Sequence, residues 1–173
     1  MESRMELSSV PTDAQLTAWA TQVAEEVQRN GLMLVTAESC TGGWIAKVLT
    51  DLAGSSAWFD AGVVTYSYAA KQALLGVSPD TLASAGAVSR ETALEMVSGA
   101  LERFAAGVAV AVTGIAGPTG GTPDKPVGTV WIGWQKRGGE ASARLFHFAG
   151  DREAVRRQTV AAALIGVAKT LTD

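Results

Sequence analysis

Residues 32–52 read LMLVTAESCTGGWIAKVLTDL, and this stretch carries the clearest indication of the fold class. Its first part, 32–37, is apolar and rich in strand-forming residues, which is typical of a short buried strand. Its last part, 44–52, has the composition and spacing of a helix. Only the tight turn ESCTGG separates the two. A strand that passes directly into a helix is the repeating step of an α/β fold.

The same alternation continues along the rest of the chain. In order, the pattern predicts a helix over 13–30, a strand over 32–37, a helix over 44–52, a strand over 58–67, a short helix over 69–75, another turn or two from 79, a helix from 89, strands over 107–113, 127–135 and 143–148, and a last helix after 151. The strand over 107–113 is nearly all valine and alanine, which predicts the centre of the sheet. Gly138-Gly139 predicts an antiparallel hairpin between the last two strands. We therefore expect a three-layer α/β/α sandwich with a mixed five-stranded sheet, parallel in its first part.

The bulk properties argue against several classes of protein. The 173 residues have room for one domain, which we place at 13–173, and we expect residues 1–12 to form a disordered N-terminal extension. A net charge of −3 without a run of Lys or Arg argues against nucleic-acid binding, although a small anionic substrate remains compatible. No stretch has signal-peptide or membrane-spanning character, so we expect a cytoplasmic protein that has no membrane partner.

The turn after the first strand places hydroxyls and glycines at the start of a helix. Ser39 and Thr41 lie where unpaired backbone N–H groups and the helix dipole favour negative charge, and Gly42 and Gly43 follow. Such a turn can hold an oxyanion or a phosphate. An equally good interpretation is that Ser39 or Thr41 caps the helix, while the glycines only permit close packing.

The second strand is followed by Tyr66 and, in the first turn of the next helix, by Lys71. The positive end of the helix dipole disfavours a charged lysine there and lowers its pKa, more so if the amine is buried. A neutral lysine can act as a general base. The alternative is an exposed Lys71 and a half-buried Tyr66, which is the commoner situation at an arbitrary strand–helix junction.

A glycine-rich loop after the central strand and the start of the last helix form a third candidate segment. Thr113, Gly114 and Gly117 allow backbone amides to approach a ligand closely. Arg152 stands at a helix start, where acidic residues are preferred, and Arg156 lies one turn further. Paired arginines suit a phosphate. Alternatively, the loop is a flexible connection and Arg152 pairs with a carboxylate elsewhere.

The sequence offers little to other catalytic chemistries. His147 is the only histidine and falls within a predicted strand, so a histidine-dependent triad is not expected. Cys40 is the only cysteine, which excludes an intramolecular disulfide, and with no histidine nearby in sequence it ranks well below Ser39 as a nucleophile. No cluster has metal-ligand spacing, and we expect neither a metal nor an organic cofactor.

Several long motifs occur in a fixed order: TAESCTGGWIAKVLTDLAGSSAWFDAGVVTYS, AAKQALLGV, GAVS, TGIAGPTGGTPDKPVGTVW and GDREAVRRQ. Together they resemble the C-terminal domain of the CinA (competence-damage-inducible) family, over nearly the whole chain from the first helix onward. The resemblance implies hydrolysis of nicotinamide mononucleotide to nicotinate mononucleotide and ammonia, a step of pyridine-nucleotide salvage. It also implies a homodimer, because relatives tend to be dimers.

The resemblance further assigns roles to particular residues. It implies a catalytic group of Ser39, Tyr66 and Lys71, and a phosphate-binding arginine in the GDR segment, here Arg152. The family's Tyr-Ser-Asn has Tyr68 in place of the asparagine, so a contact of that asparagine is not carried over. A non-enzymatic nucleotide-phosphate-binding or regulatory module and a phosphate-ester hydrolase stay open as alternatives. The tyrosine and lysine favour the amidohydrolase, because a phosphate cradle needs neither.

Overall fold

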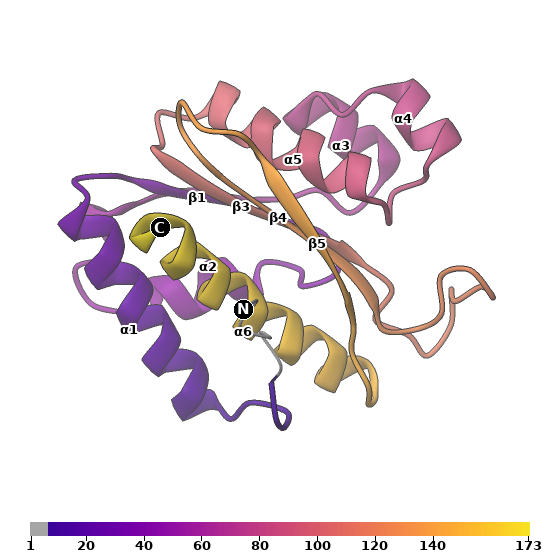
Figure 1. Ribbon diagram of the computed structural model, residues 1–173, viewed down its shortest axis with the longest axis horizontal. Helices are drawn as coiled ribbons and strands as arrows, with labels where there is room; N and C mark the ends of the chain where they lie inside the picture. Colours follow the sequence, from indigo (N-terminus) through magenta and orange to yellow (C-terminus); the bar gives the residue numbers. More distant parts are fainter. Residues whose placement is uncertain (1–6) are drawn as a thin grey trace.

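The computed structural model describes residues 7–173, which form a five-stranded mixed sheet between two layers of helices (Figure 1). The strands lie in the order β2-β1-β3-β4-β5. Their bounds are β1 Leu34–Glu38, β2 Phe59–Val64, β3 Val108–Gly114, β4 Thr129–Lys136 and β5 Ser142–His147. Strand β1 runs parallel to β2 and β3, whereas β4 is antiparallel to β3 and β5 is antiparallel to β4. The predicted sandwich, the mixed sheet, its central strand and its terminal hairpin are confirmed.

The helices divide between the two faces of the sheet (Figure 1). One layer contains α1 Asp13–Arg29, α2 Trp44–Thr50 and α6 Arg152–Thr172, and the other contains α3 Tyr68–Leu75, α4 Pro79–Ser84 and α5 Arg90–Arg103. A short 3₁₀ helix, η1 Ser55–Ala57, which was not predicted, precedes β2. Within residues 7–173, no helix combines the length and the apolar character needed to cross a membrane.

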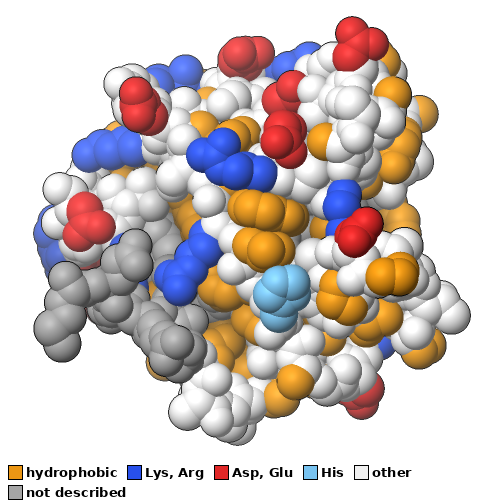
Figure 2. Space-filling model, turned by 45° about the vertical axis from the view of Figure 1, so that its right-hand side comes forward, with side chains coloured by type: hydrophobic (Ala, Val, Ile, Leu, Met, Phe, Trp, Pro, Cys, Tyr) orange, Lys and Arg blue, Asp and Glu red, His pale blue; other side chains and the backbone are white. Residues whose placement is uncertain are grey.

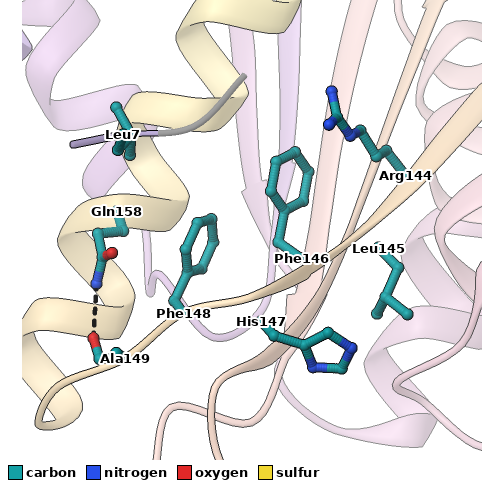
Figure 3. A pocket seen from close by; sticks show the side chains of 8 residues that line it. All are labelled: Leu7, Arg144, Leu145, Phe146, His147, Phe148, Ala149 and Gln158. Atoms are coloured by element: carbon teal, nitrogen blue, oxygen red, sulfur yellow. Dashed lines mark hydrogen bonds between the residues drawn. The ribbon is translucent and has the colours of Figure 1, made fainter. Parts of the chain in front are cut away.

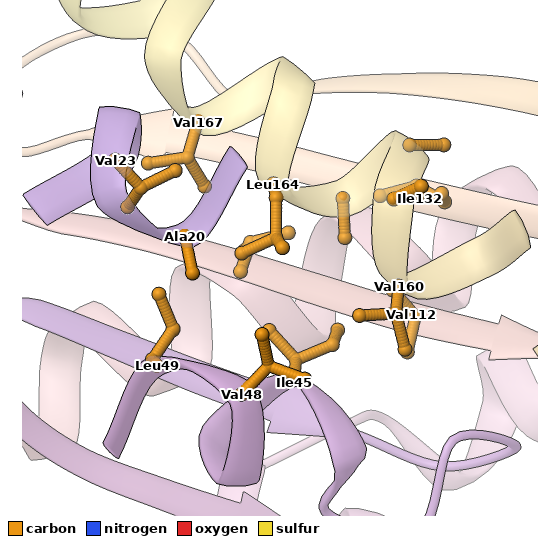
Figure 4. Packing of buried hydrophobic residues seen from close by; sticks show 14 of the residues in the cluster. Ala20, Val23, Ile45, Val48, Leu49, Val112, Ile132, Val160, Leu164 and Val167 are labelled. Atoms are coloured by element: carbon orange, nitrogen blue, oxygen red, sulfur yellow. The ribbon is translucent and has the colours of Figure 1, made fainter. Parts of the chain in front are cut away.

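Strand β3 separates two hydrophobic cores because its side chains alternate between the faces. Val108, Val110 and Val112 pack in the core under α1, α2 and α6, while Ala109 and Ala111 pack in the core under α3, α4 and α5. Figure 4 shows side chains of the three helices in the first layer meeting the sheet. A strand covered on both faces must be apolar at every position, which explains its composition.

Capping side chains lie at three of the predicted helix starts. Thr12 and Gln15 form a capping box at α1, Ser89 accepts from the Thr92 N–H at α5, and Asp151 accepts from the Ala154 N–H at α6. The predicted disordered extension covers residues 1–12. Residues 1–6 of it lie outside the described residues, whereas Leu7 packs against the first core and Pro11 is buried.

Strand β2 ends at Val64, earlier than predicted, because the next residues serve the following helix. The Thr65 N–H makes the last contact with β1, at the carbonyl of Glu38 (2.8 Å). Ser67 is the N-cap of α3, and its hydroxyl accepts from the Ala70 N–H (3.0 Å). The segment between them leaves the sheet and carries Tyr66 at the surface.

Candidate active site

Ser39 and Lys71 meet at the carboxyl ends of two adjacent parallel strands. Ser39 directly follows β1, and Lys71 lies in the first turn of α3, after β2. The Lys71 Nζ atom lies 3.0 Å from Ser39 Oγ and donates to the carbonyl of Thr65 (2.7 Å). Both side chains are buried, Lys71 completely. The fold thus joins two residues that the sequence separates by 32 positions.

Burial favours the uncharged form of Lys71. Desolvation lowers the pKa of Lys71 below its ordinary value of 10.5, and no described carboxylate forms an ion pair with its amine. A neutral amine keeps a lone pair, so it can accept the hydrogen of the Ser39 hydroxyl. The interpretation of Lys71 as an exposed surface lysine is wrong.

Glu38 holds the start of helix α2 and was not predicted as a site residue. Its carboxylate accepts from the Thr41 hydroxyl (2.6 Å) and from the N–H groups of Ile45 (2.9 Å) and Ala46 (3.0 Å). The residue is 1% exposed; burial raises the pKa of Glu38, and these hydrogen bonds oppose the shift. The only sequence signal was a carboxylate at the end of an otherwise apolar strand.

The cap supplied by Glu38 changes the role of the nucleophile turn, residues 39–43. Neither Ser39 nor Thr41 caps α2; its N-cap is Gly43, in the left-handed conformation (φ 97°) without a side-chain cap. The sequence predicted unpaired N–H groups at the start of α2 that a ligand could use. Two of these groups, those of Ile45 and Ala46, donate to Glu38 instead. No described residue accepts from the N–H groups of Cys40 and Thr41.

Arg156 contacts the opposite side of the nucleophile turn. Its Nε donates to the Cys40 carbonyl (3.1 Å) and its Nη2 to the Thr41 carbonyl (3.2 Å), while its guanidinium lies over the Trp44 ring. Position 42, beside the Arg156 side chain, favours glycine. Its φ is 61°, and a Cβ there would lie 3.3 Å from Arg156 Nη2.

Arg152 connects two loops at the surface of the site. Its Nη2 donates to the Tyr66 hydroxyl (3.1 Å) and its Nη1 to the Gly117 carbonyl (2.8 Å). Tyr66 is 62% exposed, and no described residue other than Arg152 forms a side-chain hydrogen bond with it. Among residues 7–173, neither Arg152 nor Arg156 pairs with a carboxylate. Tyr66 is therefore joined to Arg152 rather than to Lys71.

The end of β3 lies beside the end of β1, which brings the glycine-rich loop to the same edge of the sheet. Thr113 is buried and donates its hydroxyl hydrogen to the Ala87 carbonyl (2.7 Å). Gly114 has no space for a Cβ against Val130, and Gly117 has a φ of 80°. These residues fix the course of the loop.

Thr65 is a second buried polar residue that the sequence did not reveal. Its carbonyl receives the Lys71 amine, and among the described residues its hydroxyl is without a hydrogen-bond partner. No periodicity or spacing distinguished this threonine from an ordinary strand residue.

The Cys40 thiol and His147 take no part in this arrangement. Cys40 is buried, and burial raises the pKa of its thiol to about 12, which disfavours a thiolate nucleophile. His147 is exposed on the edge strand β5, where Figure 2 shows it among hydrophobic side chains. It lines a groove of about 380 Å³ together with Phe146, Phe148 and neighbouring residues (Figure 3). None of the residues around Ser39 and Lys71 lines this groove.

The site is that of an α/β protein in which a buried lysine faces a serine at the strand ends. The chain matches the family model described as CinA C-terminal domain over residues 16–171, and it belongs to this family. It is 52% identical over 153 residues to the nicotinamide-nucleotide amidohydrolase PncC of Escherichia coli (strain K12), which covers 88% of this chain and 93% of that protein. It is 51% identical over 158 residues to the protein of the same name from Pseudomonas putida, covering 91% of this chain and 98% of that protein.

Solved structures show the same fold. The competence/damage inducible protein CihA from Agrobacterium tumefaciens superimposes with a TM-score of 0.89 at 45% identity, covering 96% of this chain and 100% of that chain. The competence damage-inducible protein A (ComA) from Klebsiella pneumoniae gives a TM-score of 0.87 at 41% identity, covering 91% of this chain and 97% of that chain.

Proposed function

We propose that this protein hydrolyses the carboxamide of nicotinamide mononucleotide, giving nicotinate mononucleotide and ammonia. The observation that carries the proposal is the 3.0 Å contact between Ser39 Oγ and the buried amine of Lys71. The substrate comes from the relatives named nicotinamide-nucleotide amidohydrolase, which align over nearly their whole length. We expect the reaction to serve pyridine-nucleotide salvage in the cytoplasm, carried out by a homodimer, as the family resemblance implies.

Neutral Lys71 serves as the general base in the first step. It accepts the Ser39 hydrogen while Oγ attacks the carboxamide carbon, and the carbonyl oxygen becomes an oxyanion. The protonated amine then gives its proton to the nitrogen that leaves as ammonia, which leaves the acyl group of nicotinate mononucleotide as an ester on Ser39. Water, deprotonated by Lys71, attacks this ester; the bond to Ser39 Oγ breaks, Lys71 returns the proton to Oγ, and nicotinate mononucleotide leaves as the carboxylate. The direct contact between Lys71 and Ser39 makes a proton relay through Tyr66 unnecessary.

Backbone N–H groups of the nucleophile turn stabilise the oxyanion. Those of Cys40 and Thr41 are candidates, because no described residue accepts from them. Removing one such donor typically lowers the rate by a hundredfold or more, about 3 kcal/mol.

Arg152 holds the nucleotide phosphate in this proposal. It is exposed beside Tyr66 and the glycine-rich loop, and the structure gives it no carboxylate partner among residues 7–173. Its planar guanidinium can donate to two phosphate oxygens, and the loop that contains Gly114 and Gly117 lies alongside. Tyr66 contributes by orienting Arg152. Phosphate binding far from the reacting carbon then aligns the carboxamide with Ser39.

Ammonia release from nicotinamide mononucleotide tests the proposal. The wild-type protein should release ammonia, and rapid acid quench followed by mass spectrometry should detect a nicotinate mononucleotide ester on the peptide that contains Ser39. The Ser39→Ala variant should remain folded and bind the nucleotide, but give neither ammonia nor adduct. Binding without ammonia release by the wild type would identify a non-enzymatic module instead, and release of phosphate would identify a phosphate-ester hydrolase.

A further inference from the structure

The side chain of Arg156 is hydrogen-bonded to the main chain of the nucleophile turn. An arginine that recognises phosphate presents both arms of its fork to the ligand. Here Nε and Nη2 are both directed at carbonyls, those of Cys40 and Thr41, and the plane of the guanidinium rests over Trp44. Arg152 differs because its side chain is exposed and only one of its contacts is with a carbonyl, that of Gly117, while the other is with the exposed Tyr66 hydroxyl.

The contact with the Cys40 carbonyl fixes the direction of a neighbouring N–H group. The peptide between Cys40 and Thr41 is planar and trans, so its C=O and its N–H point in opposite directions. Because the Cys40 carbonyl points at Arg156, the Thr41 N–H points away from it.

The layers of the fold show where this N–H is directed. Arg156 reaches the turn from α6, on one face of the sheet, whereas Lys71 reaches Ser39 from α3, on the other face (Figure 1). The side opposite to Arg156 is thus the side on which the reacting groups lie. The Thr41 hydroxyl is held separately by Glu38 (2.6 Å), so residue 41 is restrained through both its side chain and its main chain.

We propose that Arg156 is a positioning residue that orients the Cys40–Thr41 peptide, and thereby presents the Thr41 N–H to the oxyanion. The inference rests on the proposed amidohydrolase function and assigns this arginine to the transition state rather than to the phosphate. A preorganised donor of this kind acts on kcat, because it binds the oxyanion and not the ground-state substrate.

Two variants and a matched control test the inference. Arg156→Ala removes both hydrogen bonds, and Arg156→Lys keeps the positive charge but lacks the planar fork. Arg157→Ala is the control: Arg157 also lies over Trp44, yet it bonds to Asp13 and Glu153 and not to the turn. We expect kcat to fall about a hundredfold in Arg156→Ala and about tenfold or more in Arg156→Lys, with KM nearly unchanged and Arg157→Ala close to wild type.

Chemical rescue and the pH profile separate positioning from general destabilisation. Added guanidinium ion should restore part of the kcat of Arg156→Ala, whereas added ammonium should not. The acidic limb of the pH profile, which reports Lys71, should stay in place while the plateau falls. A raised KM with normal kcat would assign Arg156 to the phosphate and overturn the inference, as would an equal loss of kcat in Arg157→Ala.

A crystal structure of Arg156→Lys tests the same point without any activity measurement. A rotated Cys40–Thr41 peptide supports the inference, and an unmoved peptide contradicts it. An active wild type with an unmoved peptide refutes the inference alone. A wild type that releases no ammonia refutes the proposed function, and a rotated peptide would then leave only the orienting contact of Arg156 standing.

Discussion

Ser39 and Ser67 occupy equivalent places in the chain, each between the end of a parallel strand and the start of a helix. Ser67 accepts from the Ala70 N–H with its hydroxyl and is thereby used as the cap of α3. The Ser39 hydroxyl does not cap α2, because the Glu38 carboxylate accepts from the N–H groups at the start of that helix. A serine at a helix start is therefore available for chemistry where another group accepts from the backbone N–H groups of that helix.

Replacing Lys71 with Met should give the largest loss of activity, because Lys71 is the base that contacts Ser39. The variant keeps the length of the side chain but has no lone pair for the Ser39 hydrogen, so kcat should fall roughly 10²- to 10⁴-fold. Ammonia release measures the loss. Lys47→Met, which alters an exposed lysine of α2 paired with Asp51, is the control and should keep full activity. Normal turnover in Lys71→Met would remove Lys71 from the mechanism.

The pH dependence should show that the Ser39 contact relies on an uncharged amine. Because burial lowers the pKa of Lys71 in the folded state, kcat/KM should rise with pH through a pKa below 10.5 and then level off. An acidic limb centred at 10.5 or above would contradict the assignment.

The lowered pKa of Lys71 also predicts that the stability of the protein depends on pH. The folded state binds fewer protons than the unfolded state between the folded pKa of Lys71 and 10.5, so the free energy of unfolding gains a contribution that grows with pH in this window. Lys71→Met lacks this contribution. Urea unfolding at a series of pH values should therefore show wild type gaining stability relative to Lys71→Met as the pH rises, and a constant difference would argue against the shift.

Arg152→Ala should act on substrate binding and leave the chemistry at Ser39 intact. Loss of a charge-assisted contact with phosphate is worth about 1.5–3 kcal/mol, which corresponds to a KM roughly 10- to 150-fold higher for nicotinamide mononucleotide. Nicotinamide riboside, which lacks the phosphate, is the matched substrate, and its KM should change little. An unchanged KM for the mononucleotide would place the phosphate elsewhere.

Ser67→Ala should give the smallest effect on turnover and complete the comparison of the two serines. The loss of an N-cap lowers the free energy of unfolding by about 1 kcal/mol, while ammonia release should stay within about twofold of wild type. Urea unfolding and ammonia release, measured on the same preparation, separate the two quantities. A loss of activity as deep as that of Ser39→Ala would show that the two serines do not differ as the structure indicates.

Local patterns predicted most of the fold. The strand–turn–helix at 32–52, the caps Ser89 and Asp151 and the apolar strand at 107–113 all follow from short-range rules, and the structure has them. The end of β2 was predicted too late, because Thr65 and Tyr66 are strand-forming residue types that continue the pattern past Val64, although Ser67 already serves the next helix.

The site was predictable only in part, for a physical reason. Local chemistry and the family resemblance marked Ser39 and Lys71, but their contact depends on how β1 and β2 pair. The roles of Glu38 and Arg156 depend on side chains that meet only after α2 and α6 pack. Periodicity describes which face a residue occupies, and it does not describe which distant group that residue will meet.

The shielded thiol next to Ser39 has a practical consequence. Cys40 is the chain's only cysteine, it is 6% exposed, and its pKa of about 12 keeps it protonated. Peroxide and alkylating reagents attack thiolates, so they find no ready target beside the nucleophile. A hydrolase built in this way would keep working under oxidative conditions that inactivate enzymes with a reactive cysteine.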